Sequence, residues 1–140
     1  MLQTGFMKTM LLLPLLYISF FLPPSLCGYE KERATANLAT DFAQCSAFYL
    51  ISAEAIRRTG DERLAIRFME ASRIAYDYSV NFGSQKVTQE RIKSAVHELA
   101  KEIGHDYSNF PILTLKYAEM CKGALNSPKK RLQYWLDRKE

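Results

Sequence analysis

From about residue 33 onward, apolar residues recur at steps of three and four, the spacing that places side chains on one face of a helix. Over the segment from Arg33 to Thr59, these positions are Leu38, Phe42, Cys45, Tyr49, Ser52 and Ile56. Gly60 predicts the end of this helix, because glycine readily adopts the left-handed backbone that terminates many helices.

A second stripe with the same steps follows, with Asp61 as its predicted N-cap and Gly83 as its end. Its predicted inward positions are Leu64, Phe68, Ala71, Ala75, Tyr78 and Phe82. Because only Thr59-Gly60-Asp61 connects the first two helices, we expect them to lie side by side and antiparallel.

A third helix is predicted to start between Val87 and Glu90 and to end near Gly104. Its expected buried positions are Ile92, Val96, Leu99 and Ile103. Residues 105–111 then predict a break, because Pro111 disfavours helical backbone at Phe110. Ser108 or Asn109 can cap the helix that follows.

The fourth predicted helix extends to Ala124, and a short fifth helix follows. The inward positions of the fourth helix are Leu113, Tyr117, Met120, Cys121 and Ala124. Ser127 is the expected cap of the fifth helix, with Pro128 in its first turn. Its apolar side holds Leu132, Trp135 and Leu136.

No run of alternating apolar and polar residues predicts a strand, so the expected fold class is all-α. We predict a small antiparallel bundle of four to five helices. Residues 28–126 form its core, and residues 127–140 form a short basic C-terminal helix packed on or flanking the bundle.

The chain begins with the layout of a secretory signal peptide. Lys8 precedes the apolar run 10–22, and Pro23-Pro24-Ser25-Leu26-Cys27-Gly28 forms a break after it. We expect residues 1–27 to be cleaved off and the protein to be exported, to the periplasm or outside the cell. The alternatives are an uncleaved membrane anchor and a lipoprotein whose acylated residue is Cys27. Translation from Met7 rather than Met1 also fits the pattern.

Cleavage after Cys27 leaves two cysteines, Cys45 and Cys121, which are 76 residues apart. That separation does not fit the short-spaced pairs of zinc or redox sites, so a structural disulfide is expected in an exported protein. Closing a loop of this size stabilises a fold by about 4 to 5 kcal/mol in the loop-entropy model. If the protein is not exported, two buried thiols are the alternative.

The net charge of +4 comes largely from the C-terminal tail, because residues 128–140 hold five basic and two acidic side chains. The rest of the mature chain is close to neutral. This argues against a broad nucleic-acid-binding face, which needs basic residues spread over a surface. The basic last helix could instead contact an anionic membrane surface or an acidic partner.

Candidate chemistry is sparse. Glu98, Glu102 and His105 share a helical face and are the only weak candidates for a metal site, and a solvated helix face is the favoured interpretation of them. The chain has no Gly-x-Ser-x-Gly motif and no glycine-rich phosphate loop, and both mature cysteines lie on apolar stripes. We therefore expect no catalytic residues and no cofactor.

Aromatic residues are abundant, and some fall outside the predicted inward stripes. Such side chains often form protein contacts, so they are the candidate partner-binding residues together with a neighbouring arginine. Phe48, Tyr76 and Tyr134 fall outside the stripes, and Arg131 and Trp135 of the last helix complete the set. The sequence thus favours an exported, non-catalytic helical protein that binds an unidentified protein, as inhibitors, immunity proteins, chaperones or secretion accessories do. The alternative is a helical-bundle carrier of a small ligand or metal.

Overall fold

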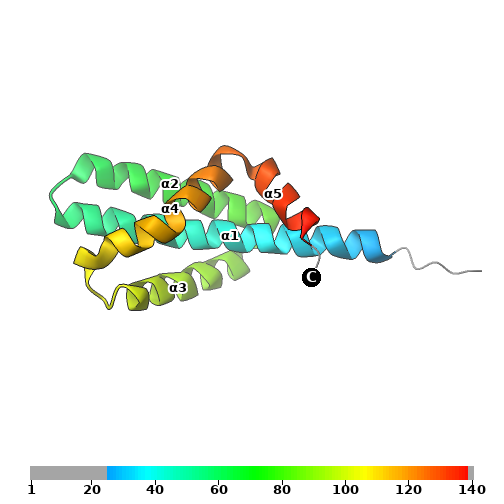
Figure 1. Cartoon of the computed structure of the whole chain (residues 1–140), viewed down its shortest axis with the longest axis horizontal. Helices are drawn as coiled ribbons and strands as arrows, with labels where there is room; N and C mark the ends of the chain where they lie inside the picture. The colour runs from blue at the N-terminus through cyan, green and yellow to red at the C-terminus, as the bar shows by residue number, and fades with distance from the viewer. Residues whose placement is uncertain (1–24, 139–140) are drawn as a thin grey trace, which may run out of the picture.

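The protein is an all-α bundle organised around one long central helix (Figure 1). A computed structural model describes residues 25–138. The helices are α1 (Ser25–Arg58), α2 (Glu62–Phe82), α3 (Gln85–Glu102), α4 (Phe110–Asn126) and α5 (Pro128–Asp137), with a 3-10 turn, η1 (Tyr107–Asn109), before α4. The prediction of four to five helices without strands is confirmed for this part of the chain.

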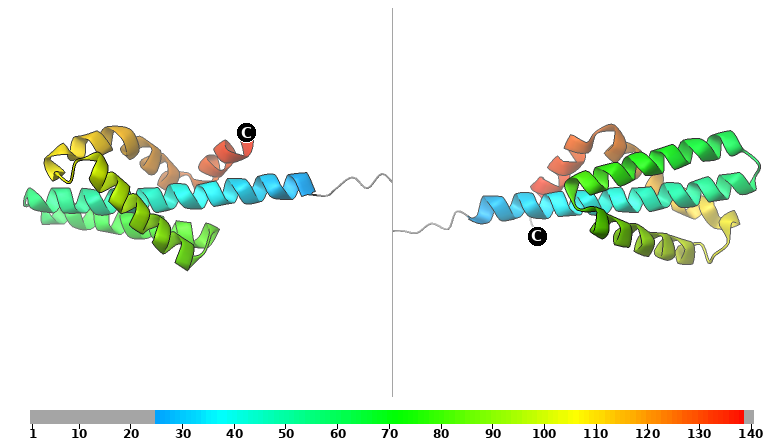
Figure 2. Two further views of the ribbon diagram at one scale, coloured as in Figure 1. Left: turned by 90° about the horizontal axis from the view of Figure 1, so that it is seen from below. Right: turned by 180° about the vertical axis from the view of Figure 1, so that it is seen from behind.

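The other four helices all pack against the central helix α1. α2 runs alongside it, α3 crosses it obliquely, and α4 and α5 lie over the face turned toward the viewer in Figure 1 (Figures 1 and 2). One core cluster centres on Phe48, Leu99 and Leu113. A smaller cluster, around Leu38 and Phe42, holds Leu132 and Trp135 of α5 against α1.

The turn between α1 and α2 follows its local sequence closely. Gly60 has φ +90°, a backbone conformation that disfavours L side chains, and the Asp61 carboxylate accepts a hydrogen bond from the Leu64 amide at 3.0 Å. This is the N-cap that the sequence predicts, since an aspartate oxygen satisfies an amide of the first turn. The predicted antiparallel pairing of α1 and α2 is confirmed.

Three details of the sequence prediction are wrong. The first helix begins at Ser25 rather than near Arg33, so the predicted boundary after Cys27 falls within its first turn. Phe110 is already helical, because it ends the 3-10 turn with φ −49° and ψ −33°. The third error concerns the inner face of α2. Of the predicted stripe, Ala75 is buried, four positions pack partly buried against the core and Leu64 is exposed. The other buried residues of α2 are small ones that the stripe omitted, namely Ala65, Ser72 and Ser79.

The small residues of α2 let its backbone lie close to α1 and exchange hydrogen bonds with it. The Ser72 hydroxyl donates to the Ser46 carbonyl at 3.0 Å, and the Ser79 hydroxyl donates to the Ala39 carbonyl at 2.8 Å. Buried hydroxyls need such partners, because an unpaired one costs about 1–3 kcal/mol. The larger side chains of α2 consequently lie beside the contact instead of within it.

Residues 1–24 of the predicted signal peptide lie outside the described part of the chain. Within residues 25–138, no helix combines the length and apolarity that a membrane span requires.

Candidate functional site: an apolar groove between α2 and α3

The helices α2 and α3 are joined at one end by a rigid polar contact. The Ser79 and Thr88 hydroxyls are 3.0 Å apart, and Ser79 also donates to the Ala39 carbonyl of α1. All three residues are fully buried. The turn at Gly83 and Ser84 is therefore pinned to α1, and the two helices diverge from it over the surface of α1 (Figure 2).

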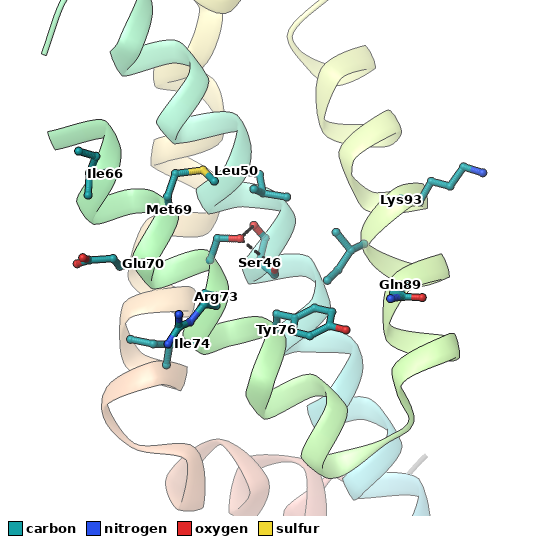
Figure 3. Close-up of a pocket in the computed structure, with 12 residues that line it drawn as sticks. Ser46, Leu50, Ile66, Met69, Glu70, Arg73, Ile74, Tyr76, Gln89 and Lys93 are labelled. Carbon is teal, nitrogen blue, oxygen red and sulfur yellow. Dashed lines mark hydrogen bonds between the residues drawn. The ribbon is translucent and has the colours of Figure 1, made fainter. Parts of the chain in front are cut away.

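An open groove of about 880 Å³ lies where α2 and α3 separate. Ser46 and Leu50 of α1 lie between the two ribbons, and Tyr76 reaches from α2 toward α3 (Figure 3). The lining continues over α2 with Ile66 and Ile74, on the side of that helix facing away from α3. A volume in the range of about 300–1,000 Å³ and a mostly apolar lining are typical of binding sites.

Several apolar side chains of α2 are exposed, in the groove and on the adjoining outer face of the helix. Met69, in the groove, is 42% exposed, and Ile66 and Ile74, on the outer face, are 50% and 49% exposed. Single exposed apolar residues are common, but a group of them on one helix beside a hollow is typical of an interaction surface. The groove is thus the strongest candidate binding site in the described part of the chain.

The polar groups of the groove are mainly hydrogen-bond donors. Arg73 and Tyr76 come from α2, and Gln89 and Lys93 come from α3, with Glu70 as the single carboxylate. Within residues 25–138, none of these side chains forms a hydrogen bond or an ion pair with another residue of the chain. By contrast, the hydroxyls of Ser46 and Ser72 at the floor lie 3.0 Å from each other and are satisfied.

The structure separates the predicted partner-binding residues into different environments. Tyr76 is half-buried and lines the groove. Phe48 is only 2% exposed and packs in the core, with its ring centroid 6.2 Å from that of Phe110. Its side chain is therefore not part of any exposed surface, because α4 covers the face of α1 on which it lies.

The other three predicted residues belong to the contact between α5 and α1. Arg131 Nε and Trp135 Nε1 both donate to the same oxygen of Asp41, each at 2.6 Å. Tyr134 is 41% exposed, and its ring stacks edge-on with that of Trp135. The guanidinium of Arg131 lies 4.4 Å from the centre of the Tyr134 ring. Arg131 and Trp135 thus hold α5 in place, whereas Tyr134 is accessible.

The three weak metal candidates are not brought together. Glu98 accepts a hydrogen bond from Ser94 at 3.3 Å, and Glu102 accepts bonds from Lys116 at 2.9 Å and Tyr117 at 3.1 Å. The hydrogen bond from Lys116 to Glu102 raises the pKa of that lysine. Among the described residues, no group of three or more potential ligands could hold a metal ion. Glu102 instead links α3 to α4.

The Cys45 and Cys121 sulfurs form a disulfide with an S–S distance of 2.10 Å. It joins the middle of α1 to the last turns of α4, as the sequence predicts. Both cysteines are fully buried, so the bond lies inside the core rather than at a reactive surface.

Comparisons with protein-family models, with curated protein sequences and with solved structures give no match to this chain.

Sequence reasoning missed the groove itself. Ile66, Met69 and Ile74 are apolar but fall outside the predicted inward stripe of α2. Apolar residues beyond those needed for the core were the available signal of a binding surface. The hollow also requires that α2 and α3 diverge. This divergence depends on three-dimensional contacts such as the one between Ser79 and Thr88.

Proposed function

We propose that this protein is a non-catalytic binding protein that accepts an apolar helix of another protein in the groove between α2 and α3. The observation that supports this proposal is the mostly apolar lining of that groove, where Met69 is 42% exposed and Tyr76 is half-buried beside Leu50 of α1. A groove with a helix as floor and a helix on each side suits an amphipathic helix, which would lay its apolar face into it.

A photo-crosslinking residue at Tyr76, whose side chain reaches from α2 toward α3, tests this proposal in the cells that produce the protein. We expect an adduct with one defined protein, identified by mass spectrometry and lost in Met69→Glu, because a carboxylate would be buried at the contact. The matched control is Leu115→Glu on α4, which changes a 90% exposed leucine outside the groove and should preserve the adduct. An adduct that survives Met69→Glu would contradict the proposal.

The second candidate function is a carrier of a small apolar ligand, favoured by the volume of the groove. Native mass spectrometry of the purified protein distinguishes the two functions. A bound small molecule that is lost in Met69→Glu would support the carrier, whereas protein without added mass would count against it.

Export is part of the proposal and is supported by the N-terminal sequence pattern. We expect the exported protein to begin at Gly28, which intact-mass measurement of the secreted or periplasmic fraction checks. A mass that retains residues 1–27 would instead favour the uncleaved anchor.

Contact between α5 and an anionic membrane stays a prediction. Leu132 and Trp135 pack on the bundle, so charged residues such as Lys129 and Lys130, together with the exposed Tyr134, remain available for it. Such a contact would be electrostatic and strongly dependent on salt.

A further inference from the structure

We infer that this protein forms an antiparallel dimer in which the outer face of α2 packs against the same face of a second copy. Ile66, Glu70 and Ile74 mark this face, and in Figure 3 all three lie on the side of α2 that is turned away from α3. Tyr76 reaches toward α3 instead, so the outer face is separate from the groove. The dimer is therefore independent of what binds in the groove.

The apolar residues of the outer face are placed symmetrically about Glu70. Ile66 and Ile74 lie four residues to either side of it, and they are 50% and 49% exposed. Steps of four keep all three side chains on one side of a helix. In an antiparallel pair centred on Glu70, Ile66 of one copy is level with the partner's Ile74. Two apolar layers would thus form, one on each side of the centre.

The charged residues of the outer face complement the same face of a second copy. Arg63 lies seven residues before Glu70 and Asp77 lies seven residues after it, and both are exposed. In the same antiparallel pair, each Arg63 is therefore level with the partner's Asp77. Arg67 and Arg73 lie three residues to either side of Glu70 and are also exposed, so the two glutamates that meet at the centre lie among four arginines. Such self-complementarity is what a two-fold symmetric interface requires.

These charges are available for a second copy. Within the described residues, none of the five charged side chains forms an ion pair or a hydrogen bond with another residue of the chain. Exposed ion pairs contribute little to affinity, whereas opposed charges fix the register and orientation of an interface. The apolar layers therefore supply most of the attraction, and the charges select the antiparallel arrangement.

The size of the outer face predicts a weak dimer. Residues 63–77 span about 21 Å at 1.5 Å per residue. Seven residues of this helix form the face, whereas a stable interface uses about 20–30 residues on each side. We therefore expect a reversible dimer with a dissociation constant in the micromolar range.

Sedimentation equilibrium of the purified protein, over about 5–500 µM, tests this inference. We expect Arg63→Asp and Asp77→Arg each to weaken the dimer about tenfold, because each places like charges opposite one another at both ends. An equimolar mixture of these two variants should dimerise about as strongly as the unmodified protein. Every charge at position 63 then faces an opposite charge at position 77, and misfolding of either variant could not produce this recovery.

Three further variants locate the interface. Ile66→Glu should abolish the dimer, because it places a carboxylate within an apolar layer. Met69→Glu in the groove and Leu115→Glu on α4 are the matched controls, and both should dimerise like the unmodified protein. A protein that stays monomeric at 500 µM, a mixture without recovery, or a dimer that survives Ile66→Glu would each overturn the inference. Loss of the dimer in Leu115→Glu would overturn it as well, since the interface would then lie on α4.

Discussion

Asp41 is the residue on which the attachment of α5 depends most. One of its oxygens accepts both the Arg131 and the Trp135 hydrogen bonds, and its side chain is only 13% exposed. Nearby, Arg33 donates to the carbonyls of Trp135 at 3.2 Å and of Arg138 at 2.6 Å. Arg33 thereby satisfies carbonyl groups at the end of α5 that have no partner within their own helix.

Replacing this carboxylate should loosen α5 without unfolding the bundle. We expect Asp41→Asn to lower the free energy of unfolding by about 1–3 kcal/mol, because a charged hydrogen bond is lost in a half-buried site. Trp135 is the single tryptophan, so its fluorescence emission should shift to the red as the ring becomes more exposed. Asp77→Asn, at an exposed carboxylate, is the control. Unchanged emission and an unchanged urea midpoint would contradict this role.

Two exposed carboxylates make stability depend on acid pH. Hydrogen bonds from Arg58 lower the pKa of Glu54, and the Ser108 amide lowers the pKa of Asp106. A lowered folded-state pKa stabilises the fold above the pKa of the unfolded chain, and this contribution is lost as pH falls through the folded-state value. We therefore expect the urea midpoint to decrease below about pH 4. Glu54→Gln/Asp106→Asn should flatten this decrease, and an equally steep decrease in that variant would refute the assignment.

At the residue scale, the sequence predicted the helix caps and turns better than it predicted which side chains are buried. Asp61 and Gly60 have the conformations expected of them because capping depends only on neighbouring residues. Phe48 fell outside the predicted stripe but is buried, since α1 contacts other helices on several sides. A single inward face cannot describe a central helix.

Among the elements, α2 shows why periodicity located the helix but not its contact face. The large side chains of α2 placed the predicted stripe to one side of the observed contact, and Ala75 is the position that the stripe and the buried face share. The observed contact uses Ser72 and Ser79, whose hydroxyls are satisfied by carbonyls of α1. Those partners lie 26 and 40 residues away in the chain, so no local pattern reveals them.

Two glycines should respond oppositely to alanine. A Cβ atom at Gly83 would lie 3.2 Å from the Ser79 carbonyl oxygen and 3.5 Å from the Ala39 side chain, so Gly83→Ala should destabilise the protein by about 1 kcal/mol. Gly123 is within α4 and has open space around it. Gly123→Ala should stabilise by about 0.5–1 kcal/mol, because alanine loses less backbone entropy in a helix. Thermal unfolding checks both signs, and the same sign for both would contradict the packing at the turn.

At the scale of the whole molecule, the Cys45–Cys121 bond lies on one side of the central helix α1. It connects α1 to α4, while α2 and α3 lie over other faces of α1 (Figures 1 and 2). The groove lies on the α2 and α3 side, so its walls do not contain the disulfide. Removing the bond should therefore lower the free energy of unfolding without weakening binding in the groove.

We expect Cys45→Ala/Cys121→Ala to lose about 2–5 kcal/mol of unfolding free energy, because the unfolded chain regains the freedom of a 76-residue loop. Urea unfolding should show this loss, and adding reductant should lower the midpoint of the unmodified protein but not that of the variant. Below the unfolding transition, the variant should form the photo-crosslinked adduct in the groove as well as the oxidised protein does. Weakened binding by a folded variant would show that α4 and the disulfide help to shape the groove through α1.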